Sequence, residues 1–85
     1  MSAGIATQGR AATALIADRD DRFRGIVRRA IEGLVRIVGE ADSAESAVSL
    51  ARQLEPDVIL IDLDLPEDGG ITVARRIKVE QPQVR

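Results

Sequence analysis

The strongest constraint on the fold is an uninterrupted apolar run at residues 58–61, Val-Ile-Leu-Ile, that ends in Asp62. Its length and β-branched content are typical of a strand buried on both faces of a sheet. Pro66, Gly69 and Gly70 follow and force the chain into a loop. We therefore expect the Asp62 carboxylate at the C-terminal end of a strand, where open α/β sheets gather ligands and reactive groups.

Hydrophobic periodicity divides the rest of the chain into further strands and helices. Apolar runs at residues 13–17 and 35–38 predict two more strands. Three helices are predicted: one from Asp20 or Asp21 to about Leu34, one between Asp42 and Pro56, and one at about residues 71–79. Their apolar faces are expected to be Phe23, Ile26, Val27, Ala30, Ile31 and Leu34, then Ala44, Ala47, Val48, Ala51 and Leu54, then Val73, Ala74 and Ile77.

Polar residues next to these segments predict how the helices begin. Asp20 or Asp21 is placed to cap the first helix, where a carboxylate also favours the positive end of the helix dipole. Asp42 and Glu45 have the spacing of a capping box for the second helix. Gly69 and Gly70 are expected to permit the turn into the third helix.

The order of elements predicts an α/β domain. Strands that alternate with helices through short connections form a parallel sheet with right-handed crossovers. If the first strand lies between the other two, the strand order is 2-1-3, and Asp18 and Asp62 meet where the winding reverses. Helices then cover both faces of the sheet. Residues 1–12 are small and polar, and we expect them to form a flexible tail.

Composition restricts the chemistry of this site. The chain has no histidine and no cysteine, which removes the commonest general base and the thiolate metal ligands. A formal charge of −2 provides no broad basic surface, so we expect no direct nucleic-acid binding by this segment. No secretory signal and no apolar stretch of about 20 residues is present, which predicts a cytoplasmic location without membrane contact.

Two motifs resemble the receiver domain of bacterial two-component response regulators. Leu15-Ile-Ala-Asp18-Arg19 is similar to the strand that opens that domain and ends in two acids. Asp62-Leu-Asp-Leu-Pro66-Glu-Asp-Gly-Gly70 is similar to the phosphoacceptor segment Asp-x-x-Met-Pro-x-x-x-Gly. Residues 37–41 and 56–62 resemble the subfamily with a C-terminal helix-turn-helix output domain. The resemblance covers residues 13–85 and implies a flavodoxin-like fold.

The resemblance implies a phosphoacceptor module rather than an enzyme. Asp62 is expected to accept a phosphoryl group from a sensor histidine kinase and so to control an output domain that acts in transcription. The reaction needs an exposed carboxylate and a cation that offsets the charge of the phosphoryl oxygens. The resemblance assigns Mg²⁺ to that role, held by Asp18, Asp62 and the backbone carbonyl of Asp64, with the ligands that Mg²⁺ prefers.

The acidic site departs from the family pattern at Arg19, which replaces the second acid of the first loop. Exchanging a negative for a positive charge near the metal changes its interactions by several kcal/mol at an effective dielectric of about 20. We therefore expect weakened Mg²⁺ binding. Asp20, Asp21 or Asp68 could turn inward to compensate, or Arg19 itself could neutralise phosphoryl charge.

The family pattern also includes two further strand-helix units, which carry a hydroxyl residue and a lysine that grip the phosphoryl group. Neither unit is found before Arg85, so residues 13–85 are expected to form an incomplete receiver-like domain. Lys78 is the only lysine, and it lies in the third predicted helix. The strand at residues 58–61 is then predicted to have an unpaired edge, which favours self-association.

Two other functions remain open from the sequence. Arg19 fits a degenerate receiver that binds partners without being phosphorylated. Asp62-Leu-Asp64 also resembles the Asp-x-Asp motif of haloacid-dehalogenase-type phosphatases, in which the first acid is the nucleophile and the second a general acid. That family has Thr or Val four residues after the nucleophile, where this chain has Pro66.

Overall fold

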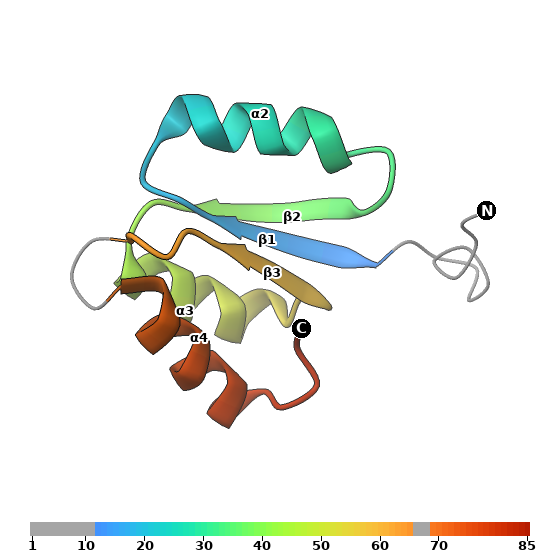
Figure 1. Ribbon diagram of the computed structural model, residues 1–85. Helices are drawn as coiled ribbons and strands as arrows, with labels where there is room; N and C mark the ends of the chain where they lie inside the picture. The colour runs from blue at the N-terminus through green and yellow to red at the C-terminus, as the bar shows by residue number, and fades with distance from the viewer. Residues whose placement is uncertain (1–11, 66–68) are drawn as a thin grey trace.

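A three-stranded parallel sheet with helices on both faces forms the molecule (Figure 1). The computed structural model describes residues 12–65 and 69–85. The strand order is β2-β1-β3, which confirms the predicted 2-1-3 order of a flavodoxin-like sheet. The elements are β1 (Thr13–Ala17), α2 (Asp21–Ile31), β2 (Arg36–Ala41), α3 (Ala44–Leu54), β3 (Val58–Ile61) and α4 (Gly69–Glu80). The tail predicted at residues 1–12 lies, apart from Ala12, outside the described residues, as does Asp68.

The hydrophobic core lies on the face of the sheet that α3 and α4 cover (Figure 1). Leu15 and Ala17 of β1 are completely buried, and Val73 of α4 is completely buried with them. Figure 1 shows α2 alone on the opposite face. The predicted apolar face of α2 is therefore only half covered: Phe23 is 49% exposed and Ile26 is 59% exposed. One helix shields less apolar surface than the pair on the other side.

Strand β2 is longer than the sequence predicts. It runs from Arg36 to Ala41, whereas the predicted strand ended at Val38. Between Ala14 and Leu15 the pairing with β2 shifts register, from Ile37 to Gly39, so β2 contains a bulge. Gly39 follows the bulge and pairs with Leu15, so the pairing with β1 continues to Ala41.

The predicted helix starts are right for α2 and wrong for α3. Oδ1 of Asp20 accepts hydrogen bonds from the backbone N of Arg22 at 2.9 Å and of Phe23 at 3.3 Å. The capping box of α3 is made by Ser43 and Ser46, whose hydroxyls each accept from the other's backbone N at 3.2 Å, and not by Asp42 and Glu45. Both pairs have the same spacing. β2 extends to Ala41, so the chain turns into α3 one residue later than predicted.

Helix α4 starts earlier than predicted and buries a slightly different face. It begins at Gly69 rather than at about residue 71. Its buried residues are Gly70, Val73 and Ile77, whereas Ala74, which we expected in the apolar face, is exposed. The earlier start adds Gly70, which lies one turn before Val73, to the packed face.

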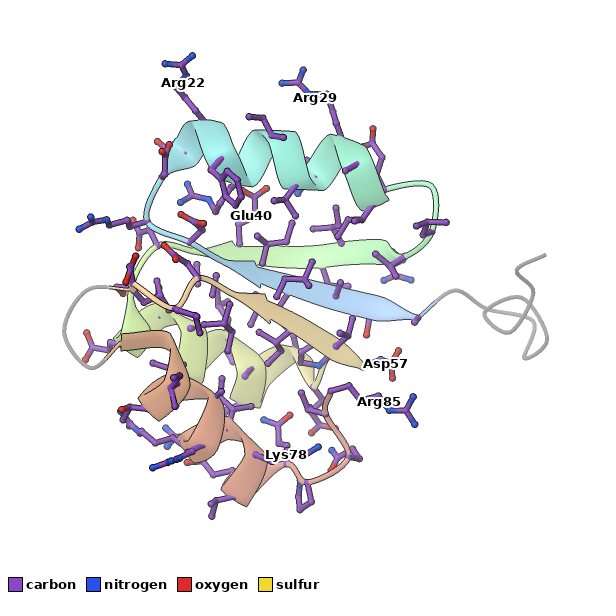
Figure 2. All side chains as sticks on the ribbon, in the orientation of Figure 1. Arg22, Arg29, Glu40, Asp57, Lys78 and Arg85 are labelled. Carbon is purple, nitrogen blue, oxygen red and sulfur yellow. The ribbon has the colours of Figure 1, made fainter. Side chains whose placement is uncertain are left out.

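The outer edge of β3 is paired at its start, contrary to the prediction of an unpaired edge. The backbone N of Arg85 donates to the carbonyl of Asp57 at 3.0 Å, and the N of Ile59 donates to the carbonyl of Arg85 at 2.8 Å. Figure 2 shows Arg85 and Asp57 at the same end of the sheet. Val84 is buried in the core and so holds the neighbouring Arg85 against the edge of β3. Farther along β3, Leu60 remains 39% exposed.

A left-handed residue at the end of α3 gives a test of the fold. Glu55 is the C-cap at φ 46° and ψ 58°, a conformation that glycine adopts without steric cost. Glu55→Gly is expected to raise the free energy of unfolding by about 0.5–1 kcal/mol, the αL penalty less the added unfolded-state entropy. Urea unfolding measures this change.

The matched control places glycine where the helix is right-handed. Ser49→Gly in the exposed middle of α3 is expected to lower the free energy of unfolding by about 0.5 kcal/mol. Destabilisation by both variants would contradict the left-handed conformation of Glu55.

Candidate functional site

Two carboxylates emerge from neighbouring strands at the same edge of the sheet. Asp18 follows β1 and Asp62 follows β3, and the last residues of these strands, Ala17 and Ile61, are paired in register. The backbone N of Asp62 donates to the carbonyl of Ala17 at 2.9 Å, and that of Asp18 donates to the carbonyl of Ala41 at 2.9 Å. The predicted meeting of the two acids is thereby observed.

A pocket of about 320 Å³ contains most of the predicted site residues. It is lined by Asp18, Arg19, Asp20, Phe23, Asp62 and Asp64. Asp21 is not part of this lining, because its carboxylate pairs with Arg24 on α2. Asp68 lies outside the described residues. The aromatic ring of Phe23 had no predicted role here.

Local hydrogen bonds orient both carboxylates. Oδ1 of Asp18 accepts from the backbone N of Asp20 at 2.8 Å, and Oδ1 of Asp62 accepts from the backbone N of Asp64 at 3.0 Å. Asp18 is 6% exposed, whereas Asp62 is only half-buried and so can be reached from solvent. A carboxylate accepts up to about four hydrogen bonds, so each retains acceptor capacity after these contacts.

The donor set is compatible with Mg²⁺ but is small. Among residues 12–65 and 69–85, no three His, Cys, Asp or Glu side chains are grouped so that they could hold a metal ion. Mg²⁺ needs less than that, because it binds through one or two carboxylates and keeps several waters. Asp18, Asp62 and a backbone carbonyl satisfy this requirement. Arg19 is exposed at the rim and adds a positive charge to the pocket.

The glycines after Asp62 let α4 start directly against the loop that carries it. Gly69 has a φ of +80°. The backbone N of Gly70 donates to the carbonyl of Leu63 at 2.9 Å. A Cβ at position 70 would lie 2.2 Å from the carbonyl O of Asp62. Only glycine permits this approach, which bears out the predicted role of these two residues.

Next to Asp18 lies an ion-pair network that was not predicted from the sequence. Glu40 of β2 accepts from Nε of Arg24 at 3.0 Å and from Nε of Arg28 at 2.8 Å. The hydrogen bond from Arg28, followed by that from Arg24, holds the pKa of the Glu40 carboxyl below its usual range. Arginines four residues apart on one helix were the available signal, but their partner lies in another element.

A family model described as the response regulator receiver domain matches residues 14–85. The chain belongs to this family. Response regulator GacA of Pseudomonas aeruginosa is 42% identical over 74 residues, which are 84% of this chain and 34% of GacA. The chain thus spans about a third of the length of the GacA proteins it matches.

Solved receiver structures have the same fold. The signal receiver domain of the putative response regulator NarL from Mycobacterium tuberculosis is 32% identical, with a TM-score of 0.84 over 89% of this chain and 63% of that one. RcsB from Salmonella enterica serovar Typhimurium, bound to promoter rprA in the presence of the phosphomimetic BeF3-, is 27% identical. Its TM-score is 0.77, over 86% of this chain and 39% of RcsB.

No membrane-spanning helix is found in residues 12–65 and 69–85. Within the two described ranges, every helix is too short or too polar to cross a bilayer.

The close approach at Gly70 gives a test of the site. Gly70→Ala is expected to displace the Asp62 loop and to lower the free energy of unfolding by about 1–3 kcal/mol, as overpacking typically does. Urea unfolding measures the stability, and ¹H–¹⁵N spectra should show shifted amides concentrated at residues 62–64.

Gly33→Ala is the matched control, because a Cβ there meets no atom within 4 Å. Its stability is expected to stay within about 0.5 kcal/mol of the wild type. Equal stabilities of the two alanine variants would argue against the packing described for Gly70.

Proposed function

We propose that Asp62 accepts a phosphoryl group from a phosphohistidine on a sensor histidine kinase. The resulting aspartyl phosphate controls an output domain that acts in transcription. The observation that carries the proposal is the shared pocket, in which the half-buried Asp62 carboxylate lies beside Asp18 and Asp64 at the end of adjacent strands. The relatives support the same role: GacA is a response regulator, and RcsB was solved on a promoter with a phosphomimetic.

In the proposed reaction a carboxylate oxygen of Asp62 forms a bond to phosphorus while the P–N bond of the phosphohistidine breaks. The electron pair of that bond returns to the imidazole nitrogen. Asp18, Asp62 and the Asp64 carbonyl are the groups that would hold Mg²⁺, which supplies positive charge to the phosphoryl oxygens when bound. Asp18 keeps its place through the hydrogen bond from Asp20. The domain acts here as a phosphoryl acceptor, and that it is not an enzyme in its own right stays a prediction.

Phosphorylation by a small donor tests the proposal. The protein incubated with acetyl phosphate and Mg²⁺ is expected to gain one acid-labile phosphoryl group, seen by intact-mass spectrometry, because the Asp62 carboxylate is accessible in the pocket. Asp62→Asn should abolish the adduct.

Asp64→Asn is the matched control, since it removes a carboxylate but keeps the backbone carbonyl. This variant should still be phosphorylated. An unmodified wild-type protein would instead support the degenerate receiver. Steady turnover of p-nitrophenyl phosphate, lost in both variants, would support the haloacid-dehalogenase-type phosphatase.

The charge of Arg19 predicts the metal dependence of the reaction. Arg19→Asp is expected to lower the Mg²⁺ concentration that gives half-maximal phosphorylation by about tenfold, because it replaces a repulsive charge in the pocket by an attractive one. The measurement is the acetyl phosphate rate as a function of Mg²⁺.

Arg22→Asp makes the same change of charge on a side chain that points away from the sheet (Figure 2) and is not among the residues that line the pocket. Its Mg²⁺ dependence should stay within about twofold of the wild type, because screening weakens exposed charges at a distance. An equal effect of both variants would show that net charge, rather than the position of Arg19, sets the metal dependence.

The kinase, the output domain and a cytoplasmic location are parts of this proposal that come from the family and the sequence. Self-association along β3 also stays a prediction, now limited to the part of the edge beyond the pairing with Arg85.

A further inference from the structure

Arg24 connects three parts of the chain next to Asp18. Its Nη1 donates to the main-chain carbonyl of Asp18, its Nε donates to Oε1 of Glu40 at 3.0 Å, and its Nη2 pairs with Oδ1 of Asp21. The side chain is only 13% exposed, although α2 has no fully buried residue. A single guanidinium thus holds the end of β1, the end of β2 and the first turn of α2.

With the contact from Arg24, the backbone N, the carboxylate and the carbonyl of Asp18 each have a hydrogen-bond partner. Its backbone N is held by the carbonyl of Ala41, and its carboxylate accepts from the N of Asp20. Arg24 holds the remaining polar group of Asp18, the carbonyl. Glu40 immediately precedes Ala41, so Arg24 and Asp18 bind adjacent residues of β2.

Glu40 binds two arginines of α2, and the contacts of these arginines differ. Figure 2 shows Glu40 between α2 and the sheet. It also pairs with Arg28, whose Nη2 lies 2.7 Å from Oε2. Arg24 also donates to the main-chain carbonyl of Asp18, whereas the hydrogen bond of Arg28 goes to Glu40. Arg28 therefore shares the ion pair of Arg24 but not its contact with the site.

We propose that Arg24 is a positioning residue for phosphoryl acceptance: by holding the main-chain carbonyl of Asp18, it keeps that carboxylate in the pocket beside Asp62. This inference rests on the proposed function. Arg24 acts through the backbone of Asp18 and does not itself touch the phosphoryl group. A guanidinium is required because its planar fork of five donors serves three acceptors at fixed directions, which an ammonium cannot match.

The test compares Arg24→Met with Arg28→Met in the protein. The apparent Mg²⁺ dissociation constant is taken from the amide shifts of residues 18–20 and 62–64 in ¹H–¹⁵N spectra, without a phosphodonor. Arg24→Met is expected to raise this constant about tenfold, the usual effect of losing a group that orients a metal ligand. Arg28→Met should leave it within twofold. Equal effects of the two variants, or none, would overturn the proposal.

Phosphorylation kinetics give the second readout. With acetyl phosphate, Arg24→Met should require more Mg²⁺ for half-maximal rate while its rate at saturating Mg²⁺ stays closer to that of the wild type. Arg28→Met should change neither value. A fall in the saturating rate alone would contradict positioning of a metal ligand.

Arg24→Lys keeps the test decisive if Arg24→Met does not fold. Lysine retains the charge next to Glu40 but not the planar group that also reaches Asp18. The Mg²⁺ dissociation constant should therefore still rise in Arg24→Lys, whereas Arg28→Lys should leave it unchanged.

Failure of the proposed function can be distinguished from failure of the role proposed for Arg24. A wild type that binds Mg²⁺ but gains no phosphoryl group refutes the proposed function, whereas a phosphorylated Arg24→Met with wild-type Mg²⁺ dependence refutes only the role of Arg24.

Discussion

The pairing of β1 with both of its neighbours is the constraint on which the site depends. Ala17, the last residue of β1, pairs with Ala41 of β2 and with Ile61 of β3, so all three strands end at one level. The residues that follow must then emerge together, and this brings Asp18 beside Asp62. Side chains alternate along a strand, so a slip of one residue would turn one carboxylate toward the opposite face. Burial of β1 on both faces opposes that slip, because a shift would move the Asp18 carboxylate toward the fully buried position of Ala17.

The site at the sheet edge was predictable because the same local pattern, an apolar run that ends in aspartate, occurs twice in the sequence. The apolar runs before Asp18 and Asp62 specify two buried strands, and the helical spacing between them specifies crossovers, so parallel pairing follows. The glycine pair was equally readable, since φ +80° at Gly69 and the contact at Gly70 both exclude a side chain. In each case few other residue types could take the same position without a steric or solvation cost. Such positions are the ones at which sequence determines structure most directly.

The errors fall where two local solutions have similar energies. Ser43 and Asp42 are comparable N-caps, and each has a partner three residues later. The choice is made by the length of β2, which depends on its pairing with β1 and on the bulge before Gly39. The contact of Arg24 with Glu40 joins two residues that are 16 positions apart and lie in different elements, so no helical or strand period signals it. Tertiary pairing decides these features, and periodicity carries no information about it.

Arg24, which contacts Asp18, and Arg19, which lines the pocket, act on the site in different ways because their own surroundings differ. Arg24 is nearly buried and lies against two carboxylates, those of Asp21 and Glu40, so its charge is locally offset and its contribution is geometric. Arg19 lines the pocket itself and is exposed there, so its charge acts on whatever cation or anion enters. A positive charge at that position opposes a metal ion but attracts phosphoryl oxygens. We therefore expect the balance between these two effects, and not the count of acidic residues, to set how strongly the proposed reaction at Asp62 depends on Mg²⁺.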